Sequence, residues 1–283
     1  MATNPKPVSI HGGHSGQFCN HAQDTLEAVI QAYIAKGFQW VGITEHMPPP
    51  EDRFLYSEEL QAGLDARQMQ DRFGRYIHEG RRLQKKYADR IEIFIGFETE
   101  AYSGAFQLAA ELSAQYRPDY ILGGVHHVAD IAFDAGPETY KQAVSAVGGI
   151  EALYCRYLDL QHELILALRP QVVAHFDLIR IFDTDYLQRW RHPEIARRIR
   201  RNLETVAAMN LILDFNVAAL RKGASEPYLS GPILDQALAL GISIVPGDDS
   251  HGTATVGAFI PEGIDILKQK NCSLRWPKPE VGI

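Results

Sequence analysis

Short apolar segments alternate with longer amphipathic segments along most of the chain. Segments of strand length occupy residues 8–10, 38–44, 91–97, 120–125, 172–174, 211–215 and 242–245. Between them, residues 24–36, 57–88, 106–115, 138–168, 193–209 and 231–240 have the pattern of helices, with Asp24 as the expected N-cap of the first. This alternation predicts seven strand-to-helix steps around a parallel sheet.

Polar residues able to bind a metal follow almost every strand segment. They are His11, Glu45-His46, Glu98, His126-His127, His175, Asn216 and Asp248-Asp249-Ser250-His251. Parallel barrels collect their functional groups at the C-terminal ends of the strands, where residues distant in sequence meet. A single histidine is more often structural than functional, but recurrence at successive strand ends predicts one shared metal site.

The densest group of imidazoles is the stretch from His11 to His21, which also contains His14. Taken alone, this stretch has the alternative interpretation of an exposed histidine-rich loop. The histidines and acidic residues that follow the later strands favour the metal site instead. Imidazole mixed with carboxylate suits Zn²⁺, Fe²⁺ or Mn²⁺ better than Mg²⁺ or Ca²⁺, which prefer oxygen ligands.

Length and charge limit the class of protein. The chain has 283 residues, of which 46% are hydrophobic, so we expect one domain with a sizeable core. The formal net charge is −7 and the basic residues form no stripe, so nucleic acid and anionic membranes are not expected partners.

Three widely spaced cysteines argue against a disulfide framework. No signal-like or membrane-length apolar run is present, so we expect a cytoplasmic protein.

Seven short motifs occur in a specific order. They are His14-Ser15-Gly16 with His21, Thr44-Glu45-His46, Gly96-Phe97-Glu98, Gly124-Val125-His126, Ala174-His175, Leu213-Asp214-Phe215-Asn216 and Asp249-Ser250-His251. In this order and spacing the chain resembles the PHP (polymerase and histidinol phosphatase) superfamily, and within it the monofunctional histidinol-phosphate phosphatases. The resemblance covers about residues 8–260 of a single domain spanning residues 1–283.

The resemblance implies a distorted (β/α)₇ barrel, an α/β fold, that hydrolyses L-histidinol phosphate to L-histidinol and phosphate in histidine biosynthesis. It implies two or three divalent ions (Zn, Mn or Fe) held by His11, His14, His21, His46, Glu98, His126, His175, Asp249 and His251. A bridging carboxylate, expected to be Glu98, would hold two ions that activate a shared water. Departure of the alkoxide would fall to Asp249, His251 or a third ion.

Local geometry favours some ligands over their neighbours. His126 and His127 are adjacent and should point in opposite directions, and the family pattern favours His126. Glu98 and Glu100 share a face, and the Gly-x-Glu motif favours Glu98, which leaves Glu100 as a supporting group. The family normally begins with His-x-His, whereas this chain has two glycines between His11 and His14. A glycine bulge would restore their convergence.

A phosphate group also needs protein cations. Arg221-Lys222 resembles the Asn…Leu-Arg-Lys segment of the histidinol phosphatases, and a guanidinium grips phosphate with paired hydrogen bonds. Arg180, five residues after His175, is a second candidate. The alternative for each arginine is an ordinary surface ion pair.

Three other functions remain open at this point. A PHP phosphoesterase could act on another small phosphoester, such as a nucleotide or a sugar phosphate. An amidohydrolase would show a strict His-x-His and a lysine at a strand end, and no strand segment here ends in such a lysine. A catalytically silent metal-binding module would use fewer ligands than this chain offers. The sequence does not determine the oligomeric state.

Overall fold

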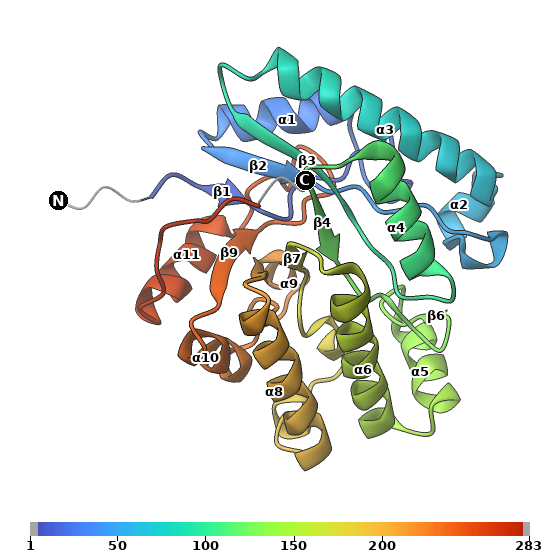
Figure 1. The fold of residues 1–283 in the computed structure, drawn as a ribbon, viewed down its shortest axis with the longest axis vertical. Helices are drawn as coiled ribbons and strands as arrows, with labels where there is room; N and C mark the ends of the chain where they lie inside the picture. Colours follow the sequence, from blue (N-terminus) through green and yellow to red (C-terminus); the bar gives the residue numbers. More distant parts are fainter. Residues whose placement is uncertain (1–4, 280–283) are drawn as a thin grey trace.

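The computed structural model describes residues 5–279, in which seven parallel strands form a nearly closed barrel surrounded by helices (Figure 1). The strand order is β1-β2-β3-β4-β7-β8-β9. The strands are β1 (Val8–Ser9), β2 (Trp40–Ile43), β3 (Glu92–Glu98), β4 (Tyr120–Gly123), β7 (Val172–Val173), β8 (Ile212–Asn216) and β9 (Ser243–Gly247). All seven strand segments expected from the sequence are present, so the α/β barrel prediction is confirmed.

The first and last strands lie beside each other without forming a ladder. Single backbone hydrogen bonds join them, from Ile10 N to the Pro246 carbonyl (2.9 Å) and from Asp249 N to the His11 carbonyl (2.8 Å). A further bond, from His14 N to the Ser250 carbonyl (2.7 Å), continues this contact beyond the strands. The segments after β1 and β9 are therefore tied together at the end of the barrel where the polar residues gather.

A compact apolar cluster fills the barrel. Its residues are Val8, Ile10, Trp40, Phe94, Tyr120, Leu122, Val172, Ala174, Ile212 and Val245. A second, larger cluster lies between the strands and the helices. Because each strand is covered on both faces, its sequence reads as a continuous apolar run. The interior is thus packed solid, and polar chemistry is confined to the barrel end.

The helices that cover the barrel are α1 (Leu26–Ala35), α3 (Ala66–Lys86), α4 (Ala105–Tyr116), α6 (Ile150–Leu168), α8 (Pro193–Ala208), α10 (Gly231–Ala239) and α11 (Ile260–Gln269). Helix α5 (Pro137–Ala146) has ten residues. The short helices are α2 (Ser57–Gln61), α7 (Tyr186–Arg189) and α9 (Ala218–Arg221), with 3₁₀ turns at Asp52–Phe54 and Leu178–Arg180. In Figure 1, α1 and α3 lie on one side of the barrel, and α5, α6 and α8 lie on the other.

Several local predictions need correction. The segments 57–88 and 138–168 each form two helices, because Gly63 (φ +70°) and the pair Gly148 (φ +87°) and Gly149 (φ +137°) interrupt them with left-handed conformations. Thr25, rather than Asp24, caps α1 by accepting a hydrogen bond from Ala28 N. Helix α11 was not expected.

The hairpin of β5 (His127–Val128) and β6 (Ile131–Ala132) was not expected either. Its antiparallel pairing places His127 opposite Ala132, and Phe133 N donates a hydrogen bond to the His126 carbonyl (3.0 Å). The chain therefore turns back over the end of β4 before α5 begins. Two-residue strands of this kind carry little periodicity, which is why the sequence gives no signal for them.

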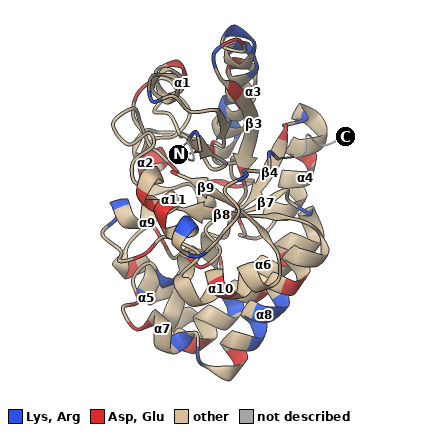
Figure 2. Ribbon diagram, turned by 90° about the vertical axis from the view of Figure 1, so that its left-hand side faces the viewer, with Lys and Arg blue, Asp and Glu red and all other residues tan. Residues whose placement is uncertain are grey.

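Charged residues of both signs are mixed on the outer surface. In Figure 2, both basic and acidic residues are visible along α3 and α8. Several of these charges form exposed pairs, such as Arg82 with Glu79 and Arg197 with Glu194. Within residues 5–279, no helix has the length and apolar character needed to cross a membrane.

Candidate metal centre

The Glu98 carboxylate lies at the centre of the polar end of the barrel. Its Oε2 lies 3.3 Å from His11 Nε2 and 3.5 Å from His46 Nδ1. Its Oε1 lies 2.7 Å from His175 Nε2 and 3.2 Å from His126 Nε2. Each imidazole follows a different strand, so the two oxygens of one carboxylate face two groups of histidines, as a carboxylate between two cations would.

The Asp249 carboxylate forms a second centre beside the first. Its Oδ1 lies 3.4 Å from His14 Nε2 and 3.8 Å from His11 Nε2. The ring of His251 stacks on that of His14, with centroids 4.5 Å apart, and the ring of His21 stacks on His251 at 5.0 Å. His21 is the most exposed of these imidazoles and lies at the rim of the site.

Two glycines allow His11 and His14 to reach the same site, but not through a left-handed bulge. Neither glycine has a positive φ. Instead, a Cβ on Gly12 would lie 2.1 Å from the Gly42 carbonyl oxygen, and one on Gly13 would lie 2.4 Å from Val29 Cγ1. The segment therefore passes too close to β2 and α1 for any side chain, and this close passage brings the His11 and His14 rings to 5.9 Å from each other.

The donor atoms at this end of the barrel fit divalent metal ions. Three groups of side chains each offer ligand atoms that lie within 4.8 Å of one another. They are His11 with His14 and Asp249, His11 with Glu98 and His175, and His46 with Glu100 and His126. Atoms that bind one Zn²⁺ at about 2.1 Å lie roughly 3–4 Å apart, so these groups are close to the required spacing.

Unpartnered nitrogens support the same conclusion. Buried ring nitrogens of His11, His14, His46, His126 and His175 form no hydrogen bond of regular geometry with the described residues, although carboxylate oxygens lie as near as 3.1 Å. The Nε2 atoms of His126 and His175 lie 3.1 Å apart, although a neutral imidazole has a single N–H. Leaving so many buried polar atoms unpaired is costly unless cations use them. The residues present therefore fit a divalent metal centre.

Charge at the centre keeps the acidic ligands ionised. Burial alone would raise the pKa of Glu98, but the imidazoles of His11 and His126 hold it well below its usual range. Burial would likewise raise the pKa of Asp249, and His11 together with His14 keeps it low. Both carboxylates are thus in the form that binds metals.

Three buried carboxylates that are not among the predicted ligands, Asp214, Glu45 and Glu100, lie against the imidazoles. Asp214 accepts a hydrogen bond from His11 Nδ1 (2.9 Å), and Glu45 lies 3.7 Å from His14 Nδ1 while it accepts two bonds from Ser15. A carboxylate behind a histidine fixes the ring and its tautomer. Sequence reasoning missed Asp214 and Glu45, although both lie within the quoted motifs.

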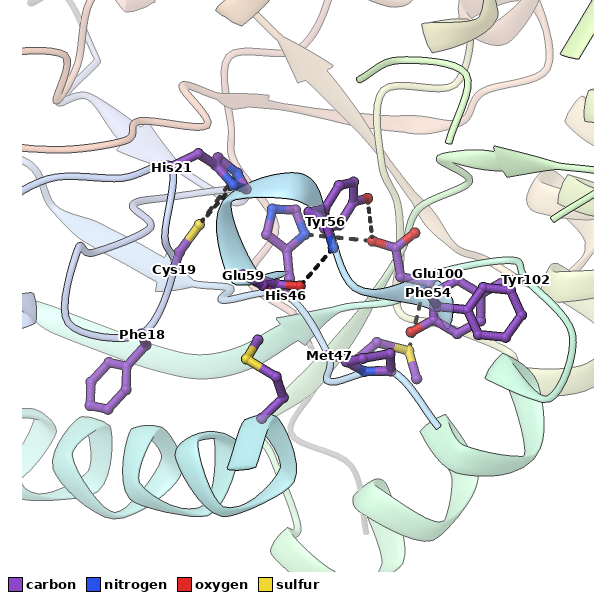
Figure 3. Close-up of a pocket in the computed structure, with 12 residues that line it drawn as sticks. Phe18, Cys19, His21, His46, Met47, Phe54, Tyr56, Glu59, Glu100 and Tyr102 are labelled. Atoms are coloured by element: carbon purple, nitrogen blue, oxygen red, sulfur yellow. Dashed lines mark hydrogen bonds and ion pairs between the residues drawn. The ribbon is translucent and has the colours of Figure 1, made fainter. Parts of the chain in front are cut away.

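The third orienting carboxylate, Glu100, lies between two adjacent histidines. Its Oε2 is 3.1 Å from His126 Nδ1 and 3.0 Å from His127 Nδ1, while Oε1 accepts a hydrogen bond from the Tyr56 hydroxyl (Figure 3). His126 reaches Glu98 with its other nitrogen. His127 instead packs its ring edge-on against Tyr102, with centroids 4.9 Å apart, and lies outside the groups that could hold a metal.

Cys19 is a further residue that the sequence analysis did not consider as a ligand. Its buried sulfur lies 3.3 Å from His21 Nε2, and Figure 3 shows it directed toward that ring. Together with His14, His46 and His251 it forms a fourth group of ligand atoms within 4.8 Å. The available signal was its position two residues before His21.

A pocket of about 510 Å³ opens above the metal centre. Its lining includes the predicted ligands His21, His46, Glu98, His126, His175, Asp249 and His251. It also includes Leu55, Tyr56, Ser57, Glu58, Ala132, Asp134, Ala135, Thr139, Leu178, Arg221 and Lys222. The pocket therefore joins the metal centre to cations, carboxylates and a small apolar surface.

The two predicted arginines have different positions. The Arg221 guanidinium lines the pocket and donates to the backbone carbonyls of Asp248 (3.2 Å) and Asp249 (2.8 Å). These bonds hold Asp249 in a left-handed conformation, with φ at +44°. Arg180 does not line the pocket; it is buried, pairs with Asp177 and donates to the carbonyls of residues 226 and 227. The structure therefore does not bring Arg180 to the site.

Comparisons with known proteins agree on one family. The model of the PHP domain matches residues 12–218. A Schizosaccharomyces pombe protein named "Probable histidinol-phosphatase" is 38% identical over 255 residues, which are 89% of this chain and 82% of that protein. The structure of HisK from Listeria monocytogenes superposes with a TM-score of 0.79 at 24% identity, covering 90% of this chain and 99% of that one.

A second solved structure contains ligands. Histidinol phosphate phosphatase from Lactococcus lactis, complexed with Zn, L-histidinol and phosphate, superposes with a TM-score of 0.69 at 18% identity and covers 95% of each chain. At these identities the two structural likenesses establish the shared fold.

Proposed function

Because the chain belongs to the PHP domain family, we propose that it hydrolyses L-histidinol phosphate to L-histidinol and phosphate. The observation that carries this proposal is the position of Glu98. Its two oxygens face separate groups of imidazoles at the floor of a pocket that also contains Arg221 and Lys222. A phosphomonoester dianion would bind between metal ions at the floor of this pocket and the cationic side chains of Arg221 and Lys222 in its wall.

We propose that the centre holds two or three Zn, Mn or Fe ions. The residues that would hold them are His11, His14, His21, His46, Glu98, His126, His175, Asp249 and His251. When bound, such ions stabilise charge on phosphoryl oxygens and lower the pKa of water that attacks phosphorus. The mixed imidazole and carboxylate donors support these metals over Mg²⁺ or Ca²⁺.

The protein side chains would bind and orient the substrate. Arg221 and Lys222 lie where they would contact phosphoryl oxygens, and the planar guanidinium offers paired donors. Burial, followed by the charges of Glu100 and Asp134, raises the pKa of the Tyr56 hydroxyl, so Tyr56 remains a neutral donor in the pocket wall. Asp249 and His251 remain our candidates to assist departure of the alkoxide.

The substrate assignment is supported by the relatives. The Schizosaccharomyces pombe relative carries the name of this activity, and the Lactococcus lactis structure contains both products of the reaction. The test is phosphate release from L-histidinol phosphate, compared with a sugar phosphate and a mononucleotide. Equal kcat/KM for the three would leave only a broader phosphoesterase, and release from none would contradict the proposal.

Removal of the metal should abolish this activity. A protein treated with a chelator should lose phosphatase activity and regain it on addition of Zn²⁺ or Mn²⁺, because several buried imidazoles then recover their partners. Elemental analysis of the reloaded protein should give two or three ions per chain. The melting temperature should fall on chelation and return on reloading. One ion or fewer after loading would contradict the proposed centre.

Replacement of Arg221 by alanine should lower kcat/KM about 30- to 1,000-fold, since roughly 2–4 kcal/mol of transition-state stabilisation would be lost. Arg221→Lys should recover little, because one ammonium cannot reproduce the planar fork. Inhibition by inorganic phosphate should weaken in parallel. Bound metal should remain, because His14 and the bond from Asp249 N to His11 still hold the Asp249 segment.

Metal analysis of the same variant distinguishes phosphate binding from support of the metal centre. If Arg221→Ala loses metal along with activity, the arginine acts by holding the Asp248 and Asp249 carbonyls rather than by contacting phosphate. Glu194→Gln, which removes a charge from an exposed pair on α8, is the matched surface control.

A further inference from the structure

Asp134 is an acidic residue of the pocket that the proposed chemistry leaves without a role. It lies between β6 and α5, on the segment that the β5–β6 hairpin turns back over the end of β4. The preceding residue, Phe133, donates a backbone hydrogen bond to the carbonyl of His126. The hairpin therefore holds Asp134 beside the metal centre, and its side chain lines the same pocket.

Its carboxylate has no partner among the described residues. Atom Oδ1 is buried and accepts no hydrogen bond. Arg221 and Lys222 line the same pocket, but neither they nor any other residue within 5–279 forms a hydrogen bond to this buried oxygen. The buried carboxylates of Glu98, Glu100 and Asp214 at this end of the barrel, by contrast, each face an imidazole.

The neighbouring donors are already in use. The Tyr56 hydroxyl donates to Glu100, and the Thr139 hydroxyl donates to the Gly136 carbonyl. The lining residues that flank Asp134 in the chain, Ala132 and Ala135, are apolar, and the nearby His126 imidazole already faces Glu98 and Glu100. An unpartnered carboxylate that is partly buried among apolar groups loses solvation without compensation. A cation carried into the pocket by a ligand would supply that compensation.

We propose that Asp134 binds the ammonium group of the substrate and thereby selects amino-alcohol phosphates from other phosphomonoesters. This inference rests on the proposed function. Phosphate at the metal centre and at Arg221 would place a nearby ammonium within the same pocket, whose lining carries both signs of charge. A sugar phosphate or a mononucleotide has no ammonium, so it would leave the buried Oδ1 of Asp134 unpaired.

Such discrimination between substrates follows from the free-energy cost of leaving a buried polar group without a partner. A site built to pair with a charged group rejects ligands that lack it, because the desolvated carboxylate then has no partner. Arg221 and Lys222 would recognise the phosphate that all phosphomonoesters share. Asp134 would recognise the part that differs, which makes it a specificity residue rather than part of the hydrolytic machinery.

The test compares substrates with and without the amine in the wild-type protein and in Asp134→Asn. For L-histidinol phosphate, Asp134→Asn should lower kcat/KM about 10- to 100-fold, mainly through KM, as expected for loss of a charged hydrogen bond. For the analogue that lacks only the amine, the two proteins should have equal kcat/KM. Metal content should be unchanged. Glu138→Gln, which removes a charge from an exposed pair on α5, should behave as wild type.

A second substrate pair makes the result independent of histidinol. Phosphoethanolamine and ethyl phosphate differ only in the ammonium, so wild type should prefer the former and Asp134→Asn should not. Failure of wild type to hydrolyse L-histidinol phosphate, with this preference intact, would contradict the proposed function and leave the inference standing.

Other outcomes would overturn the inference. Equal losses by Asp134→Asn on substrates with and without the amine would show a general effect on the pocket. A loss confined to substrates that contain imidazole would show that Asp134 binds the ring instead.

Discussion

Replacement of Glu98 by glutamine should lower kcat/KM about 1,000- to 10,000-fold, since the variant loses several kcal/mol of metal-dependent stabilisation. The amide keeps the shape of the side chain but removes the negative charge that both groups of imidazoles face. It also places an N–H donor where His11, His46, His126 or His175 now faces an oxygen. Bound metal measured by elemental analysis should fall in parallel with activity.

The matched control is Glu100→Gln. Glu100 is equally buried and lies two residues further along the same segment, but it supports His126 from behind. Loss of an orienting carboxylate typically costs about 10- to 100-fold in activity or metal affinity. Glu98→Gln should therefore be the more damaging change by at least about tenfold. Equal kcat/KM for the two variants, or full metal content in Glu98→Gln, would contradict the central position given to Glu98.

His126→Ala should abolish measurable activity, whereas His127→Ala should retain most of it. His126 Nε2 faces both Glu98 and His175, so its loss removes a donor atom from the metal centre. His127 contacts Glu100 and packs on Tyr102, so its loss removes one hydrogen bond and an aromatic contact from the core. We expect His127→Ala to lower the free energy of unfolding by about 1.5–3 kcal/mol, the usual cost of a hydrogen bond to a charged group.

Steady-state kinetics and thermal unfolding of the metal-loaded variants distinguish the two roles. His126→Ala should show the larger loss of kcat/KM, and His127→Ala should show lower stability with kcat/KM within about tenfold of wild type, since it lies one contact away from a ligand. If His127→Ala is the more damaging to catalysis at equal metal content, our assignment of the two rings is wrong.

The sequence was sufficient to predict the strands and the end of the barrel at which the site lies. A parallel strand covered on both faces needs a continuous apolar run, so each run is visible without knowledge of its neighbours. The residue after each run then falls at the C-terminal end of the barrel by topology alone. Glu98, the pair His126-His127 and His175 could be placed at that end for this reason, and the family resemblance then favoured His126 over His127. Helix interruptions at Gly63 and at Gly148-Gly149 were missed, because a glycine in a helical pattern is often tolerated.

The tertiary structure decided which groups support the ligands and which line the pocket. Asp214 and His11 are 203 residues apart, and their hydrogen bond depends on how β8 lies relative to β1. Arg221 lines the pocket, whereas Arg180 is buried and donates hydrogen bonds to backbone carbonyls. The sequence could not distinguish the two arginines, because the contacts of each guanidinium depend on how its chain segment packs against the others.

Asp134 shows most clearly what could not be predicted from the sequence alone. Nothing in its local sequence distinguishes it from a surface aspartate beside a turn. Its importance rests on a hairpin too short to leave a periodic signal and on the absence of a partner for Oδ1 among the described residues. Patterns along a chain report which face of an element is buried, whereas an unpaired charge in a pocket is a property of several segments packed together.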